Sequence, residues 1–361
     1  MSVKVSVGVR TFDRYPFSLG YIQTSGEWPF TTHFFTETQL DHFAEYCKSE
    51  KYSYLHIDAT GSVVKKLKNQ KPVYFYSMVY KDEGIASPLL PLSGALLCDQ
   101  TTASITSYFN CVLSKLALRS KTARPSFVVI DFSPALLNST LGAFNVENIH
   151  NHLRRCSNTL DRAYTATQLK SITFVRLCCS HVMKAFARSL HKIENSKELR
   201  RQLMLLFAIL LNSNDINGAF YLYEQIINIY ADPHAENSSK KLKSLLDNTN
   251  LNQEEIEEYL DEKPDEDKEP HFLDEIDITK DAIIHQSPFN VKACSRIPAL
   301  NRLILKEKID KQIINPLYSP EIVHLLHKWF AYIPLWSCIM TDFVDREYFE
   351  IVCFDSMVNL I

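Results

Sequence analysis

The stretch YSYLHIDATGSVVKK, at positions 52–66, contains the first convincing strand pattern of the chain and decides the fold class. Its Tyr, Leu and Ile residues favour a β-strand that ends on Asp58, and Gly61 predicts a turn before the chain becomes basic. The stretch SFVVID at 126–131 is the clearest buried strand, and it also ends on an aspartate, Asp131. If these two strands are neighbours, both carboxylates emerge at one edge of the same sheet.

The segments around these strands predict an α/β fold with a mixed sheet. Strand patterns at 72–80 and 87–97 follow the first strand after short connections, which is typical of an antiparallel meander. A helix pattern at 101–118, the strand at 126–131, more helix and a strand at 172–178 then alternate, which indicates β-α-β crossovers. A meander followed by crossovers matches the ribonuclease H-like plan, here with a helical insertion or C-terminal region after it.

Three regions are predicted along the chain. Residues 1–50 form an irregular N-terminal segment with a short helix at 38–50, and residues 51–193 form the ribonuclease H-like core. Residues 194–361 have the apolar periodicity of helices, interrupted by an acidic tract at about 232–281. We expect this tract to be mostly extended or mobile, because its charge resists burial.

The charge is distributed unevenly. Positions 254–277 hold 13 acidic residues against two lysines, which is a charge of −11. Because the whole chain has a net charge of −3, the rest of it carries about +8. A basic body with an acidic segment is compatible with binding to a polyanion.

Composition excludes several classes of protein. With 361 residues, 46% hydrophobic and 22% charged, the chain can bury a core and is not disordered as a whole. Only 8 glycines argue against a turn-rich all-β fold. The cysteines lack disulfide-like spacing and the start lacks a signal-peptide pattern, so we expect a nuclear or cytosolic protein that is not secreted. The apolar run at 203–211 is too short to span a membrane.

Asp58 and Asp131 are the candidate metal ligands. Carboxylate oxygens are the ligands that Mg²⁺ and Mn²⁺ prefer, and two such ions can stabilise the attacking and leaving oxygens of a phosphoryl displacement. A single pair of carboxylates rarely completes such a site. The alternative interpretation is that each aspartate caps the loop or helix after its strand.

A second candidate is the run Cys178-Cys179-Ser180-His181, which has C-x-x-H spacing where a strand meets a helix. Zinc would need further ligands, and the sequence contains no second C-x-x-C or H-x-x-H pair to supply them. A nucleophilic Cys/His pair and a buried thiol beside a histidine at the helix start are the other interpretations.

Basic residues adjoin both aspartates in the sequence and are candidate contacts to DNA phosphates, although solvated loop residues would look the same. They are Lys65, Lys66 and Lys68 after Asp58, and Arg119, Lys121 and Arg124 before Asp131. The sequence contains no G-x-x-x-x-G-K-[ST] or G-x-G-x-x-G motif, so nucleotide-binding folds are disfavoured.

Taken in order, HIDATGSVVKK, VVIDFSPALLNS and CCSHVMKAF resemble the core of the Mutator-like (MULE) superfamily of DDE transposases, over about residues 30–193. The resemblance implies that Asp58 and Asp131 are the first two metal-binding and catalytic aspartates, with Mg²⁺ or Mn²⁺ as cofactor. It also implies that Cys178 and His181 form the family's C-x-x-H motif. The family is a metal-dependent nuclease and strand-transfer core that acts on DNA, in the nucleus.

The chain departs from the family pattern at both ends. The third acidic residue of the triad should lie on a helix beyond the helical insertion, and the chain ends about where that helix would begin. The nearest glutamate, Glu350, lies in a strand-like setting and is not assigned to the triad. The zinc-type DNA-binding module usual in the family does not precede Asp58, so the sequence reads as a core truncated at both ends.

Three functions remain open at this point. The first is a transposase-derived protein that is catalytically incomplete but binds DNA. The second is an active nuclease that is completed by a late acid such as Glu350. The third is a non-enzymatic scaffold that binds a protein partner through its helical region and acidic tract.

Overall fold

The computed structural model describes most of the chain between Tyr21 and Thr341. The described residues are 21–50, 52–61, 63–65, 67–82, 89–131, 133–247, 256, 259–260, 282–304 and 313–341. Two compact units divide the chain. The first, here the sheet unit, comprises Met1–Asp131, Ala135–Val146 and Lys170–Val175, and the second, the helical unit, comprises Phe132–Pro134, Glu147–Leu169 and Arg176–Ile361. The division into three regions stays a prediction.

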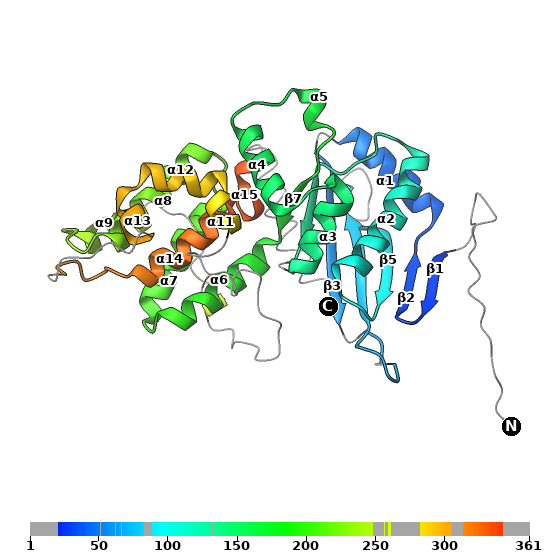
Figure 1. Ribbon diagram of the computed structural model, residues 1–361, viewed down its shortest axis with the longest axis horizontal. Helices are drawn as coiled ribbons and strands as arrows, with labels where there is room; N and C mark the ends of the chain where they lie inside the picture. Colours follow the sequence, from blue (N-terminus) through cyan, green and yellow to red (C-terminus); the bar gives the residue numbers. More distant parts are fainter. Residues whose placement is uncertain are drawn as a thin grey trace. The chain divides into compact units, whose positions relative to one another are not determined.

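A seven-stranded mixed sheet is the centre of the first unit (Figure 1). In spatial order its strands are β1 (Ile22–Glu27), β2 (Phe30–Phe34), β5 (Leu90–Leu97), β4 (Tyr74–Tyr80), β3 (Tyr54–Gly61), β6 (Phe127–Ile130) and β7 (Phe174–Leu177). The neighbours from β1 to β3 pair antiparallel, whereas β3 and β6 pair parallel. The predicted α/β class with a mixed sheet is confirmed, and the arrangement is consistent with a ribonuclease H-like fold.

The predicted strands are present with shifted ends. The meander forms β3, β4 and β5, although β5 begins at Leu90 and residues 83–88 lie outside the described part. β3 extends to Gly61, beyond its expected end at Asp58. The prediction that residues 1–50 are irregular apart from a short helix is wrong for β1 and β2, which pair as a hairpin. Pro29 lies in the turn between them, where its missing N–H removes no ladder hydrogen bond.

Three helices accompany the sheet: α1 (Glu37–Ser49), α2 (Thr102–Arg119) and α3 (Pro134–Asn145). The first begins with a capping box, in which Thr36 Oγ1 accepts the Gln39 N–H and Gln39 Oε1 accepts the Thr36 N–H. Thr101 caps α2 from one side only, with its hydroxyl accepting from the Ser104 N–H. These caps explain why the helices predicted at 38–50 and 101–118 begin where they do.

Alternating residues give the sheet a buried face and a half-buried face. On β4, Tyr76, Met78 and Tyr80 are buried, and the Tyr80 ring packs 4.9 Å from Tyr46 of α1. Helix α2 covers the same face, where Tyr108 Oη lies 2.7 Å from Ser93 Oγ of β5. The intervening residues of β4 (Phe75, Ser77 and Val79) are half-buried. This second face of β2, β5, β4 and β3 carries Asp58.

Helices make up the second unit (Figure 1). They are α4 (Ile149–Leu160), α5 (Ala166–Leu169), α6 (Cys179–Ile193), α7 (Lys197–Leu211), α8 (Ile216–Ala231), α9 (Ser238–Asp247), α11 (Ala282–Gln286), α12 (Pro288–Arg296), α13 (Pro298–Ile304), α14 (Pro320–Phe330), α15 (Ile333–Trp336) and the 3₁₀ turn η1 (Cys338–Met340). Aromatic stacking fills the core, since the Phe207 ring lies 3.8 Å from Phe186 and 4.6 Å from Trp336.

A buried polar chain crosses the same core. Tyr223 Oη lies 2.9 Å from His327 Nδ1, and His327 Nε2 lies 2.7 Å from Asn290 Oδ1. Burial lowers the pKa of His327 to about 3, so the imidazole is neutral at pH 7. A neutral imidazole has one donor and one acceptor nitrogen. Because the Asn290 oxygen can only accept, Nε2 carries the proton and Nδ1 accepts from the Tyr223 hydroxyl.

The tract at 232–281 only partly matches its prediction. Residues 238–247, expected to be extended or mobile, form helix α9, because Leu242 gives this basic segment a buried residue. Ile256 and Leu260 are also buried. The rest of the acidic run lies outside the described residues. Within the described part of the chain, no helix has the length and apolar character needed to cross a membrane.

Candidate functional site

The pairing of β3 with β6 sets the positions of the two candidate carboxylates. The register joins His56 to Val129 and Ile57 to Ile130, so Asp58 and Asp131 are the next residues on two parallel strands. Neighbouring strands lie about 4.8 Å apart, and register partners direct their side chains to the same face. The expectation that the two strands are adjacent is confirmed. Both aspartates are half-buried.

A lateral row of residues extends from these carboxylates across the half-buried face. Asp58 is the register partner of Ser77 on β4, Ser77 is the partner of Gly94 on β5, and Gly94 is the partner of Phe34 on β2. We call this row, from Phe34 to Asp131, the rung. The residues in its middle, Ser77 and Gly94, are small, so little side-chain volume lies beside Asp58 on the side of β4 and β5.

His56 precedes Asp58 on the same face of β3. Burial lowers its pKa to about 4, which leaves the imidazole neutral at pH 7. It therefore provides no positive charge beside the aspartates.

The two aspartates fit a divalent cation of the magnesium type. Such an ion is commonly held by one or two carboxylates, with water and substrate phosphate oxygens completing its shell. Among the described residues, no group of three or more His, Cys, Asp or Glu side chains is arranged to hold a metal. The alternative of a cap assumed that each aspartate ends its strand, but Asp58 lies inside β3, opposite Ser77 of β4, and for Asp131 the alternative stays open.

The C-x-x-H pair lies at the beginning of α6. Cys178 is the buried residue just before the helix, and its Sγ lies 3.4 Å from Ser180 Oγ. His181 is half-buried in the first turn. The strand-to-helix placement agrees with the sequence, but the described residues bring no third ligand to the pair. The motif belongs to the helical unit, whereas Asp58 and Asp131 belong to the sheet unit.

The candidate phosphate-binding residues fall into two groups. Lys65 and Lys68 are exposed in the loop after β3, and Asp58 lies in the C-terminal half of that strand, nearer to this loop. Lys66 is outside the described residues. Arg119, Lys121 and Arg124 precede β6, whereas Asp131 follows it. A four-residue strand spans about 13 Å, so this second group lies at the other end of β6 from the carboxylate.

Two arginines of the second group already bind partners within the sheet unit. Arg119 Nη2 lies 2.7 Å from Glu37 Oε2 of α1, and Arg119 Nε lies 3.8 Å from Asp41 Oδ1. Arg124 Nη1 donates to the Ser171 carbonyl. Lys121 is exposed. Of the candidate basic residues, Lys65 and Lys68 are therefore the best placed for a ligand at the carboxylates. Glu350 lies outside the described residues.

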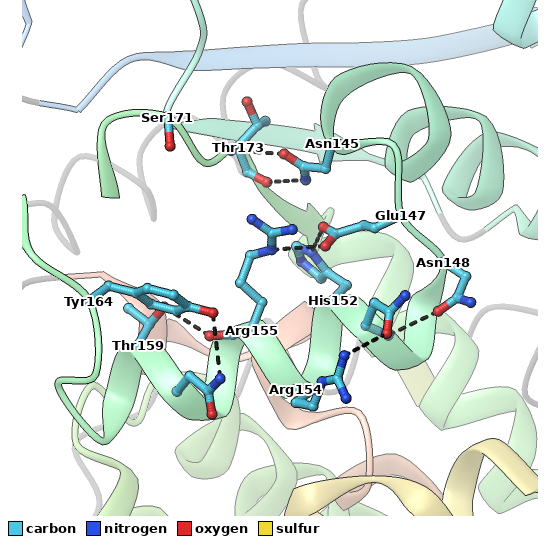
Figure 2. A network of polar contacts seen from close by, with 12 residues as sticks. Asn145, Glu147, Asn148, His152, Arg154, Arg155, Thr159, Tyr164, Ser171 and Thr173 are labelled. Atoms are coloured by element: carbon cyan, nitrogen blue, oxygen red, sulfur yellow. Dashed lines mark hydrogen bonds and ion pairs between the residues drawn. The ribbon is translucent and has the colours of Figure 1, made fainter. Parts of the chain in front are cut away.

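Sequence reasoning missed a buried ionic network at the beginning of α4, in the helical unit (Figure 2). Glu147 Oε1 lies 2.7 Å from His152 Nδ1, and Glu147 Oε2 accepts from Arg155 Nε at 2.8 Å. Burial alone would lower the pKa of His152, but Cys156 and Glu147 raise it to about 9. His152 is therefore a cation at pH 7. The only signal in the sequence was the spacing of His152 and Arg155, five and eight residues after Glu147. The contacts join the residue before α4 to the helix and so hold the beginning of the helix in place.

Comparison with known proteins gives one coarse indication of origin. No family model matches the chain. The 120.7 kDa protein in NOF-FB transposable element, from Drosophila melanogaster, is 26% identical to it over 322 residues. The match covers 87% of this chain and 28% of that protein, so the chain spans little more than a quarter of its relative. This weak similarity suggests a transposon-derived protein.

Proposed function

We propose that this chain is a transposon-derived DNA-binding protein of the Mutator-like DDE type, with a metal site that is catalytically incomplete. The observation that carries the proposal is the register of β3 and β6, which sets Asp58 beside Asp131 on the same face of the sheet. The similarity to a transposable-element protein supports it independently. DNA is the proposed partner, which implies a nuclear location in a nucleated cell.

Asp58 and Asp131 would hold Mg²⁺ or Mn²⁺ through their carboxylate oxygens. When bound, such an ion neutralises charge on a phosphate group that approaches it. The protein contributes two negative ligands on neighbouring strands, where backbone pairing fixes their separation.

Cleavage of DNA is expected to be undetectable or very slow. A phosphoryl displacement needs its ions held firmly against the attacking and leaving oxygens, and positional looseness is costly in rate. The described residues supply two carboxylates to the site. We therefore expect weak ion binding and retained DNA binding, because phosphate contacts from lysines need no ion.

Divalent-ion binding tests the metal site directly. Thermal unfolding of the wild type should shift upward with millimolar Mn²⁺, since a ligand that binds only the folded state stabilises it. Asp131→Asn and Asp58→Asn should abolish the shift. Glu45→Gln is the matched control, because Glu45 is an exposed acid of α1 whose partner is Lys48. A shift that survives both aspartate substitutions would refute the site.

DNA binding and cleavage are tested on one duplex in Mn²⁺. Neutralising Lys65, Lys66 and Lys68 together should weaken binding and reduce the slope of log affinity against log salt by about 2 to 3. Lys48→Gln, an exposed lysine of α1, is the control. Robust nicking that Asp131→Asn abolishes would show that a further acid completes the site, and the chain would then be an active nuclease.

A further inference from the structure

Three aromatic rings form a row on the half-buried face of the sheet. Phe34 of β2 and Phe75 of β4 have parallel rings, with centroids 6.0 Å apart and planes inclined by 4°. Tyr21, which is 54% exposed, continues the row with its ring 5.2 Å from that of Phe34. Phe34 and Phe75 are half-buried.

Gly94 of β5 leaves room for the rings of Phe34 and Phe75. A Cβ atom at this position would stand 2.4 Å from Phe34 Cε2 and 3.0 Å from Phe75 Cε2. Atoms of different side chains do not approach so closely, so any other residue would displace the Phe34 ring. Both rings therefore lie close to the β5 backbone at Gly94, where the glycine leaves room for them and their planes run parallel.

This aromatic row is continuous with the carboxylate pair. Phe34 and Gly94 are members of the rung, and Ser77 is the one residue between Gly94 and Asp58. With strands about 4.8 Å apart, Gly94 lies about 10 Å from Asp58 across the sheet. That distance suits a nucleotide whose base lies over the rings and whose backbone runs toward the carboxylates.

Positive charge borders the Phe75 end of the aromatic row, because Phe75 is near the beginning of β4, whereas Phe34 is at the opposite end of β2 from the turn. The loop between β3 and β4, which carries Lys65 and Lys68, is held against the β1–β2 hairpin by Gln70. Its Oε1 accepts from the Phe30 N–H at 2.8 Å, and its Nε2 donates to the Glu27 carbonyl at 3.0 Å. Lysines beside an aromatic surface are the combination that binds single-stranded nucleic acid, through phosphates and stacked bases.

We propose that Tyr21, Phe34 and Phe75 form a stacking platform for unpaired bases of a DNA strand whose backbone passes the Asp58–Asp131 pair. This proposal rests on the proposed function, which supplies DNA as the partner. It adds that the site recognises unpaired rather than base-paired DNA. Duplex DNA hides its base faces, so the platform selects single-stranded or frayed DNA.

The test compares two single-stranded oligonucleotides with the same number of phosphates, one with bases and one abasic, by fluorescence anisotropy in EDTA. The wild type should bind the base-containing strand on the order of tenfold or more tightly for each stacked base. Phe34→Ala should remove most of that preference while leaving the binding of the abasic strand unchanged. Tyr221→Ala is the control, since Tyr221 is a 64% exposed aromatic residue of the helical unit.

A second variant guards against misfolding of Phe34→Ala. Gly94→Ala keeps every aromatic ring but displaces the Phe34 ring, and it should reduce the preference for bases while far-ultraviolet circular dichroism stays unchanged. Retention of the full preference in a folded Gly94→Ala would overturn the platform.

Equal, lysine-dependent binding of both strands by the wild type would overturn the platform and leave the DNA-binding proposal standing. Binding of neither strand would overturn both. Self-association that Phe34→Ala abolishes, without any preference for bases, would assign the face to a second copy and overturn the proposal.

Discussion

Val146→Gly should stabilise the protein, although it removes a side chain. Helix α3 ends at Asn145, and Val146 follows it with φ 56, in the left-handed region. This is the position after a helix where glycine is usual, and the Val146 N–H completes the helix end by donating to the Gly142 carbonyl at 3.1 Å. A β-branched residue is strained there, at a cost of about 1–2 kcal/mol.

The net gain follows from three magnitudes. Val146 is 91% exposed, so deleting its side chain removes little packing. Glycine relieves the left-handed strain but loses about 0.5–1 kcal/mol more conformational entropy on folding. We therefore expect the free energy of unfolding to rise by about 0.5–1 kcal/mol. Neighbouring anchors keep the backbone in place, because the Asn145 amide donates to the Thr173 carbonyl at 2.6 Å and accepts from the Thr173 N–H.

Urea denaturation followed by circular dichroism measures this change. Val291→Gly is the matched control, because Val291 is a 56% exposed valine inside α12, where glycine is a poor helix former. The control should unfold at a lower urea concentration than the wild type, and Val146→Gly at a higher one. A lower midpoint for Val146→Gly would refute the reasoning, since it would mean that the exposed side chain contributes more than the backbone strain costs.

Further predictions concern the buried polar groups and the surface ion pairs. The raised pKa of His152 means that the stability from its protonated form is complete below pH 6.5 and is lost as the pH rises through about 9; urea midpoints should fall over that range, and Glu147→Gln should flatten the fall. His327 has the opposite sign, because its pKa is lowered to about 3 by burial, so the stability of its neutral form should fall as the pH drops from 6.5 toward 3, a slope that His327→Gln should reduce. Tyr223→Phe removes the donor to His327 and should cost about 1–3 kcal/mol, and no measurable loss would contradict the assigned tautomer. Arg119→Met should cost less than about 1 kcal/mol despite its two carboxylate partners, because exposed ion pairs contribute little, and a larger loss of stability would mean that the pairs fix the packing of α1.

The strands that carry the aspartates could be predicted because each is a compact run of β-formers with a clear end. The pairing of β3 with β6 followed from the expectation of a crossover, which keeps successive parallel strands together. The N-terminal hairpin could not be predicted in this way. β1 is exposed on most positions, so its sequence IQTSGE has no apolar alternation, and Pro29 resembles a break in a strand rather than a turn between two.

The remainder of the candidate site escaped prediction for a related reason. Phe34, Ser77 and Gly94 have no motif in common, and only the register of three antiparallel pairings brings them into line with Asp58. A register cannot be read from any one segment, since shifting a strand by one residue moves its side chains to the opposite face. The basic residues illustrate the converse. Arg124 is close to Asp131 in sequence, but the length of β6 separates them.

The rung has a consequence for the order in which the molecule assembles. Its five residues come from five separate segments of the chain, namely β2, β3, β4, β5 and the end of β6. β3, β4 and β5 follow one another directly, and their hairpins can form from local contacts. Phe34 joins only when β2 closes onto β5 across α1, β3 and β4, and Asp131 joins only when β6 closes onto β3 across two strands and α2. Closing long loops is entropically costly and slow. The aromatic end of the site therefore forms only when β2 has docked, and the acidic pair only when β6 has docked, so the complete rung forms late in folding.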